Sequence, residues 1–406
     1  MKTKLISLTI ALIIAMLLIF KCETSTNPNS TLITKDLISG YVQKGPFING
    51  SSITINELDE DLTQTGKVFN TQITDNKGSF EVSNITLVSN YVCLRADGFY
   101  FNEILGEQSK AQITLHALSD VSDKNTINVN IITHLEKPRI EYLISNGFSF
   151  DEAKHCAQSD ILTIFNIEKS DITSSELLNI AEQGDDNAIL LAISLILQGY
   201  RSEAELTELL SNISTDIKEN GKLNSSSLGS QLINHAIYLD TLSIRNNLEK
   251  RYSDLGVTAT IPNFNKYIRN FIDSTLFQIT EPLIEYPSSG LYGKNILSLD
   301  DTLYSGEFFS LAANLVKGTS LKVKITALNP FIEMDIWFGI WYYVVGSGIN
   351  WSITAFDYNT KTQFFTAIES DRSCDLKMLF DQGRFLIEYF EMNSALPTRT
   401  KTITKY

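Results

Sequence analysis

The spacing of hydrophobic residues changes twice along this chain, and this change limits its fold more than any other feature. Apolar and polar side chains alternate in residues 37–117, as in strands that bury one face. Residues 126–273 instead repeat their apolar positions about every 3.6 residues, and residues 290–406 alternate again. At 406 residues the chain is also too long for a single core. We therefore predict a multi-domain α+β protein with an N-terminal β-sandwich, a central all-α bundle and a C-terminal β-sandwich.

The chain begins with a leader. Lys2 and Lys4 precede an apolar run over residues 5–20, which is 16 residues long and short of the about 20 that a membrane-spanning helix needs. A secretory signal peptide over residues 1–21 is therefore the better interpretation.

Cys22 follows the leader directly, and a polar stretch, ETSTNPNS, follows Cys22. This arrangement resembles a bacterial lipoprotein signal, in which cleavage before the cysteine leaves a lipid-modified Cys22. Lys21 departs from the pattern, which usually has a small residue there, so a plain signal or an uncleaved anchor remain alternatives. The resemblance implies a lipid anchor at Cys22 and a flexible tether over residues 22–36. It places the protein in the bacterial cell envelope, as an outer membrane lipoprotein that faces the surface or the periplasm.

Turn signals separate short strands in the first zone. The stretch GYVQKGPFINGSSITINELD predicts two strands around Gly45-Pro46 and Asn49-Gly50. The stretch KVFNTQITDNKGSFEVSNI predicts two paired strands across residues 75–78, a tight turn that needs a positive φ near its end.

Four motifs follow one another in this zone: Gly40-x-Val42, Gly50-Ser51-x-Ile53, Thr74-Asp75-x-x-Gly78-x-Phe80 and Val92-x-x-x-Ala96-x-Gly98-Phe99. Over residues 37–117 this succession resembles the carboxypeptidase regulatory-like (transthyretin-like) β-sandwich. The resemblance implies a hairpin at the Thr-Asp…Gly-x-Phe step and a non-catalytic accessory module. With the leader, the helices and the C-terminal strands, the plan resembles an uncharacterised bacterial surface lipoprotein family, which offers no catalytic residues to carry over.

Start and stop signals recur in the helical zone. Helix starts are predicted at three capping boxes: Ser149-x-x-Glu152, Thr173-x-x-Glu176 and Ser202-x-x-Glu205. Helix stops are predicted at Gly199, Gly221 and Gly256.

About seven helices are expected in this zone. The stretch DNAILLAISLILQ is apolar nearly all round, which predicts the central buried helix. Pro138 interrupts another helical stretch, and either a kink or a new helix start is expected there.

The third zone follows a linker over residues 280–289, which contains two prolines. Seven runs of strand-like residues follow at the spacings of a β-sandwich, and TRTKTITKY predicts a final polar edge strand.

The charge and the reactive side chains exclude several classes of function. The net charge of −14 becomes about −17 without residues 1–21, and no basic run offsets it, so nucleic-acid binding is not expected. The four histidines and the remaining cysteines show no spacing of a metal site, and we expect structural or surface roles for them. Residues 59–61 and Asp120-x-x-Asp123-x-Asn125 fit solvated turns better than calcium loops. We predict no cofactor, no metal and no catalytic residue.

One aromatic stretch, DIWFGIWYYVVGSGINW, stands out. At a period of two, Trp337, Trp341 and Tyr343 share one strand face with Gly339 between the tryptophans. Trp351 is expected to begin the partner strand across the Gly346-Ser347-Gly348 turn. Such a row can stack sugar rings or peptide side chains, so these four aromatic residues are the candidate ligand-binding residues. The alternative is that this face is buried, since burying a tryptophan stabilises a fold by several kcal/mol at about 25 cal/mol per Å².

The leading hypothesis is therefore a non-catalytic, lipid-anchored envelope protein with a binding or structural role. Its partners would be the membrane through Cys22, a glycan or peptide ligand, and other envelope proteins. One alternative is an envelope hydrolase with a glycosidase-like carboxylate pair, which a deep groove with two partly buried carboxylates would favour. Another is an assembly subunit of an envelope complex, which a large exposed apolar patch on the helices would favour.

Overall fold

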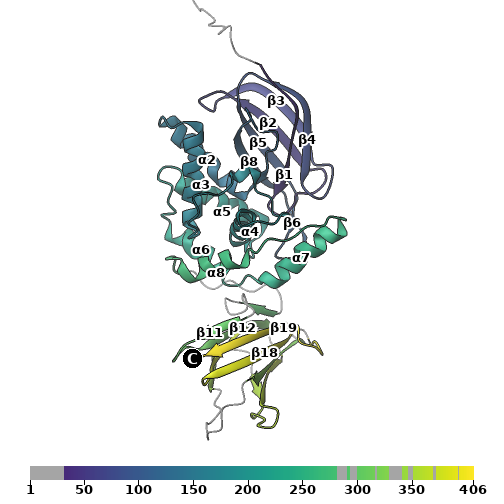
Figure 1. Ribbon diagram of the computed structural model, residues 1–406, viewed down its shortest axis with the longest axis vertical. Helices are drawn as coiled ribbons and strands as arrows, with labels where there is room; N and C mark the ends of the chain where they lie inside the picture. The colour runs from purple at the N-terminus through teal and green to yellow at the C-terminus, as the bar shows by residue number, and fades with distance from the viewer. Residues whose placement is uncertain are drawn as a thin grey trace, which may run out of the picture.

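The computed structural model describes most of the chain after the leader and tether, in these segments: 32–280, 290–292, 300–315, 318–328, 341–345, 351–368, 372–391 and 393–406. Within them the fold is mixed α+β, as predicted. Strands come first, seven α-helices follow in the middle, and strands return at the end. Figure 1 shows the first strands beside the helices in one body, with the last strands below it.

The N-terminal strands form two main sheets. One has the order β4-β1-β9 and the other β3-β2-β5-β8, while β6 and β7 form a two-stranded ribbon. The strand bounds are β1 (Ile33–Gln43), β2 (Ser52–Leu58), β3 (Gln64–Gln72), β4 (Ser79–Leu87), β5 (Tyr91–Gly98), β6 (Phe101–Asn102), β7 (Glu107–Gln108), β8 (Ile113–Asp120) and β9 (Val129–Asn130).

The predicted strand pairing across residues 75–78 is wrong. β3 pairs with β2, whereas β4 pairs with β1, so the chain passes from one sheet to the other at this turn. Gly78 does have the expected positive φ, of 84°, and a Cβ there would lie 2.4 Å from the carbonyl oxygen of Val42. Alternation shows which face of a strand is buried, but it does not specify the neighbouring strand.

Glycine at position 40 also has a structural reason. A Cβ on Gly40 would lie 2.0 Å from the carbonyl oxygen of Ile127. This close approach lets Ser39 accept a hydrogen bond from the Ile127 N–H at 2.9 Å, which holds β1 against the segment that leads into the first helix.

The helices match the predicted number and most of the predicted boundaries. Their bounds are α2 (Ile131–Ser145), α3 (Phe150–Ile164), α4 (Asp185–Gln198), α5 (Glu203–Ile217), α6 (Ser226–Ala236), α7 (Thr241–Asp254) and α8 (Asn265–Ser274), with a 3₁₀ turn η1 (Ser175–Leu177). The capping boxes at Ser149 and Ser202 are present, and α4 is buried over its whole length from Ala188. Pro138 lies inside α2 rather than at a helix start.

The predicted helix start at Thr173 is wrong, because only the turn η1 forms there. Asp186 accepts hydrogen bonds from both the N–H and the hydroxyl of Thr173, at 2.9 and 2.7 Å. The Glu176 carboxylate forms a buried ion pair with Lys154 at 2.8 Å. Neither member of the predicted capping box therefore has its side chain available for capping.

The N-terminal strands and the helices share one continuous hydrophobic core. It contains Ile53 and Leu94 from the strands together with Ile132 from α2 and Leu191 from α4, and all four are fully buried. The two predicted domains, residues 37–117 and residues 126–273, therefore pack around one common core, and each segment stabilises the other.

The C-terminal strands form a four-stranded sheet of order β10-β12-β17-β14 and a six-stranded sheet of order β11-β19-β18-β13-β16-β15. Their bounds are β10 (Gly290–Tyr292), β11 (Asp300–Leu303), β12 (Phe309–Leu315), β13 (Ser320–Ala327), β14 (Trp341–Val345), β15 (Trp351–Ile353), β16 (Thr362–Ile368), β17 (Arg372–Leu379), β18 (Gly383–Glu391) and β19 (Arg399–Lys405). A second core, separate from the first, lies among them. The predicted linker at 280–289 lies almost wholly outside the described residues.

The last strand is not an edge strand, contrary to the prediction. β19 pairs with β18 on one side and, in parallel, with β11 on the other. An ion pair between Arg399 of β19 and Asp240, the N-cap residue of α7, connects the C-terminal strands to the helices. Among the described residues, no helix is both long enough and apolar enough to cross a membrane.

Candidate functional site

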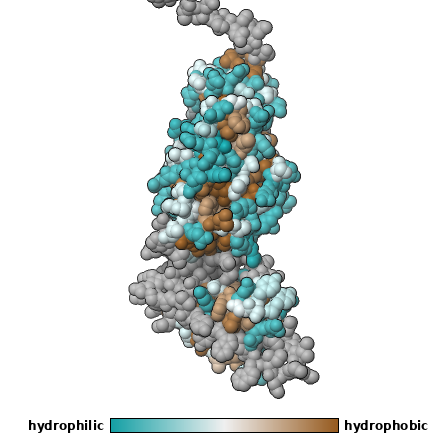
Figure 2. All heavy atoms as spheres, turned by 90° about the vertical axis from the view of Figure 1, so that its left-hand side faces the viewer, coloured by the Kyte–Doolittle hydropathy of each residue, from teal (hydrophilic) through white to brown (hydrophobic). Residues whose placement is uncertain are grey.

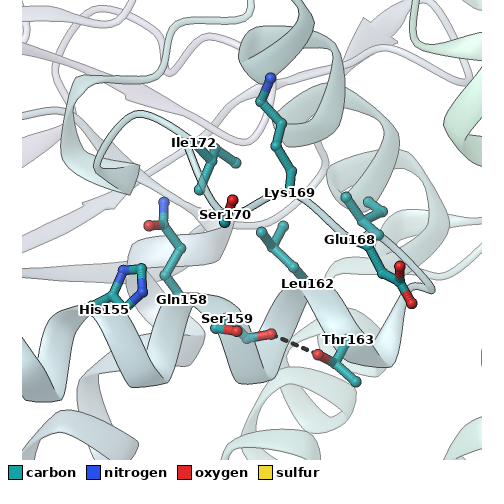
Figure 3. A pocket seen from close by; sticks show the side chains of 10 residues that line it. His155, Gln158, Ser159, Leu162, Thr163, Glu168, Lys169, Ser170 and Ile172 are labelled. Carbon is teal, nitrogen blue, oxygen red and sulfur yellow. Dashed lines mark hydrogen bonds between the residues drawn. The ribbon is translucent and has the colours of Figure 1, made fainter.

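A pocket of about 390 Å³ lies between α3 and the loop at residues 167–172. Figure 3 shows side chains of α3 rising towards this loop, with Ser170 and Ile172 opposite them. The lining residues are His155, Gln158, Ser159, Leu162, Thr163, Ile167, Glu168, Lys169, Ser170 and Ile172. We call this site the α3 pocket.

The α3 pocket combines an aliphatic floor with a polar rim. Leu162 and Ile167 are 2% and 6% exposed and belong to the main core, against which Ile172 also packs. His155 and Ser159 are exposed at the rim. Such a mixture of apolar surface and a few polar groups is typical of ligand-binding pockets.

Gln158 is the most deeply buried polar side chain of the pocket, with 6% of its surface exposed. Its amide nitrogen donates hydrogen bonds to the carbonyl oxygen of Thr173 at 2.8 Å and to Oγ of Ser175 at 2.9 Å. These two bonds fix the orientation of the amide, and no described residue donates to its oxygen. Gln158 therefore offers a fixed acceptor at the pocket wall.

A buried charge cluster lies directly behind Gln158. Ser175, which accepts the bond from Gln158, donates in turn to Glu136. Lys154 lies between Glu136 and Glu176, at 2.8 Å from an oxygen of each, and the carboxylate side chains are fully buried. This cluster joins α2, α3 and η1, and so it holds the wall of the pocket in place.

The pKa values in this cluster follow from burial and charge. Burial alone lowers the pKa of Lys154, but the two carboxylates overcome this effect and raise it. Burial raises the pKa of Glu136, and the attraction of Lys154 only partly opposes the rise. Burial also acts to raise the pKa of Glu176, yet Lys154 and Lys124 lower it to about 2. The cluster is therefore an ion-paired structural unit.

The surroundings of the pocket are acidic. Lys169 extends away from Leu162 in Figure 3, and its Nζ lies 3.2 Å from Asp186, with Asp171 and Asp185 each at 3.8 Å. Its positive charge is thus matched by carboxylates outside the pocket, and Glu168 adds an exposed carboxylate to the lining.

The strand of Trp351 lies in a different sheet from the strand of Trp341 and Tyr343. Trp337 lies outside the described residues, as do the side chains of Trp341 and Tyr343, whose backbone belongs to β14. The predicted pairing of this strand with the strand of Trp351 is wrong, because β14 pairs with β17 and β15 with β16. Trp351 itself is 8% exposed and packs in the C-terminal core, so its ring is not available for stacking a ligand.

The described histidines and cysteines do not come together in a metal site. His116 on β8 and His134 on α2 stack with their Nδ1 atoms 3.4 Å apart, a pairing that their separation in the sequence does not suggest. Cys93 is buried, and Cys22 lies outside the described residues. No group of three or more metal-ligating side chains occurs in the described part of the chain.

Sequence reasoning missed the α3 pocket. Gln158 and Leu162 belong to a predicted helix, but the loop that covers them was expected to lead into another helix at Thr173. No local motif connects the two walls, because Glu136, Lys154 and Ser175, which meet behind the pocket, come from three separate elements. No protein-family model matches the chain, and no curated protein matches it either.

Proposed function

We propose that this chain is a non-catalytic, lipid-anchored protein of the bacterial cell envelope that binds a ligand in the α3 pocket. The observation that carries the binding role is the fixed amide of Gln158 at the pocket wall, whose nitrogen makes two hydrogen bonds and whose oxygen accepts none from a described residue. An acceptor that is held in one orientation beside apolar surface can take a hydrogen bond from a ligand at no cost in side-chain ordering.

The proposed anchor is supported by the leader. Its short apolar run, Cys22 and the polar tether fit a lipoprotein that is held outside the cytoplasm. Two N-terminal sheets that share a core support the proposed carboxypeptidase regulatory-like β-sandwich, and two C-terminal sheets around a second core support a further sandwich. Membership of the surface lipoprotein family is part of the proposal and rests on the order of leader, strands, helices and strands in the sequence.

The hydrolase alternative has less support. A hydrolase of the glycosidase type needs two carboxylates beside its substrate. The paired carboxylates Glu136 and Glu176 are instead buried on Lys154, behind the pocket wall. Figure 2, which faces the side of α2 and α3, shows hydrophobic atoms gathered in the lower half of the upper body. This apolar surface also supports binding of a partly apolar ligand or an envelope partner.

Replacing Cys22 with serine is expected to move the protein from the detergent phase to the aqueous phase in a detergent partition of cells that express it. The physical reason is that the acyl chains on Cys22 would supply the membrane affinity. Intact mass of the membrane-extracted wild type is expected to show a diacylated N-terminus at Cys22. An unmodified chain that still carries residues 1–21 would contradict the anchor.

Fragments that combine an aliphatic group with a hydrogen-bond donor are expected to shift the methyl NMR signals of Leu162, Ile167 and Ile172. The variant Ile172→Glu is expected to abolish these shifts, because it places a charge on the apolar floor. The matched control is Leu276→Glu, since Leu276 is 91% exposed and does not line the pocket. A diverse fragment set that leaves the three methyl signals unmoved would contradict a binding role for the α3 pocket.

A further inference from the structure

We propose that the α3 pocket recognises a short extended peptide, taking one aliphatic side chain onto its floor and one backbone N–H onto Gln158. This inference rests on the proposed binding function and narrows it to one class of ligand. Four features of the pocket lead to it.

The first feature is the acceptor on Gln158. Both hydrogens of its amide nitrogen are used, at 2.8 and 2.9 Å, within a side chain that is 94% buried. The amide cannot turn over to present a donor without losing both bonds. The ligand must therefore bring an N–H or O–H group to this wall of the pocket.

The second feature is the aliphatic floor. None of the ten lining residues is a phenylalanine, tyrosine or tryptophan. Leu162, Ile167 and Ile172 form a surface that suits a branched alkyl group, whereas sugar rings are usually held on aromatic faces. The volume of about 390 Å³ is near the lower end of the range for ligand pockets, and it suits a few residues.

The third feature is the backbone of the covering loop. Within the described chain, no hydrogen bond is donated by the backbone N–H groups of residues 168–171, although a turn forms at Ser170 and Asp171. A run of unpaired backbone groups beside a pocket can pair with an extended peptide, as an exposed strand edge does. A small apolar molecule would form no hydrogen bonds with these backbone N–H groups.

The fourth feature is the charge around the pocket. Glu168, Asp171, Asp185 and Asp186 lie on or near the loop, and Lys169 is already paired with three of them. This excess of negative charge disfavours acidic ligands. A neutral or basic peptide segment is the class that fits all four features.

The test titrates the full mature protein with the capped tripeptide acetyl-Gly-Leu-Gly-amide and follows the methyl signals of the pocket. Methylation of the leucine nitrogen is expected to weaken binding at least about fivefold, because it removes the donor for Gln158. Replacement of the peptide leucine by alanine is expected to weaken binding about tenfold or more. Replacement of both peptide glycines by aspartate is also expected to weaken binding, because the surroundings of the pocket are negatively charged.

Two protein variants complete the test. Gln158→Met removes the acceptor and is expected to bind the leucine peptide and its N-methylated form equally, so the preference of the wild type disappears. Ile172→Ala keeps Gln158 and is expected to lose affinity for leucine while it retains the preference for the unmethylated peptide. This second variant keeps the test decisive if Gln158→Met fails to fold.

Equal binding of the methylated and unmethylated peptides by the wild type would overturn the inference. So would a trisaccharide of N-acetylglucosamine that occupies the pocket while the peptides leave its methyl signals unmoved. In both cases fragments that bind the same pocket would leave the proposed function standing. If neither fragments nor peptides move the signals, the proposed function fails together with the inference.

Discussion

Replacing Lys154 with methionine is expected to destabilise the body formed by the N-terminal strands and the helices by about 3–5 kcal/mol. Lys154 lies 2.8 Å from both Glu136 and Glu176, whose side chains are fully buried. Without this cation, the buried Glu136 would lose its ion pair, and Glu176 would keep only its ion pair with Lys124 at 2.8 Å. The free energy of unfolding at pH 7, from urea denaturation followed by circular dichroism, measures this loss.

The matched control for this prediction is Lys137→Met. Lys137 pairs with Glu141 on the surface of α2, in a contact where both side chains are partly exposed, and such pairs contribute only about 0.3–0.5 kcal/mol. Adding Glu136→Gln to Lys154→Met is expected to recover stability, because it neutralises the carboxylate that loses its ion pair, whereas Glu176 keeps Lys124 at 2.8 Å. If Lys154→Met loses less than about 1 kcal/mol, the buried cluster is not the ion-paired unit that its geometry indicates.

Lowering the pH from 7 to 4 is expected to destabilise the fold steeply, through three histidines. Burial, with the positive charges of Lys137 and Arg95, lowers the pKa of His116 to about 4. Burial and the neighbouring His116 lower the pKa of His134 to about 3, and burial lowers that of His235 to about 3. All three values lie below the model-compound value of about 6.5.

The direction follows from the protons that each state binds. Below about pH 6.5 the unfolded chain takes up protons on these histidines that the folded chain does not, so stability is complete above this pH and falls as the pH drops towards 4 and 3. Each histidine contributes a slope of up to about 1.4 kcal/mol per pH unit. The pair of His116 and His134 adds a geometric reason, since protonating both rings would set two N–H donors against each other across 3.4 Å.

The variant that isolates this effect is His116→Gln combined with His134→Gln. It removes two of the three titrating rings, and the slope of unfolding free energy between pH 6 and 4 is expected to fall accordingly. Burial raises the pKa values of Glu136 and Glu103, so these two carboxyl groups stabilise the fold as the pH falls. Both are present in the wild type and in the variant, so they do not affect the difference between the two slopes. A slope that is the same in the variant and the wild type would show that the histidine pair does not control the acid sensitivity.

Local patterns in the sequence predicted the elements well where one element alone decided the outcome. Ser149 and Ser202 cap their helices as predicted, because a capping box needs only its own first turn. The same motif at Thr173 failed because Asp186 and Lys154 compete for its side chains. The difference between these motifs lies in distant residues and not in the motifs themselves.

Pairing between strands shows the same limit. The segments on either side of residues 75–78 are strands, as predicted, yet they belong to different sheets. Trp351 begins a strand, as predicted, yet that strand pairs with β16 and the ring is buried. The proposed ligand-binding role of Trp337, Trp341 and Tyr343 stays a prediction.

The sequence by itself determined the order of strands, helices and strands, the central buried helix α4 and most helix ends. These depend on hydrophobic period and on capping, which act over a few residues. Only the tertiary structure decided which strands pair, that the N-terminal strands and the helices share one core, and that Gln158, Ser175 and Glu136 meet behind a pocket. These depend on contacts between residues far apart in the chain, whose partners are chosen by packing and by the burial of charge. The local spacing of residues does not show how distant segments pack or which charges they bury together.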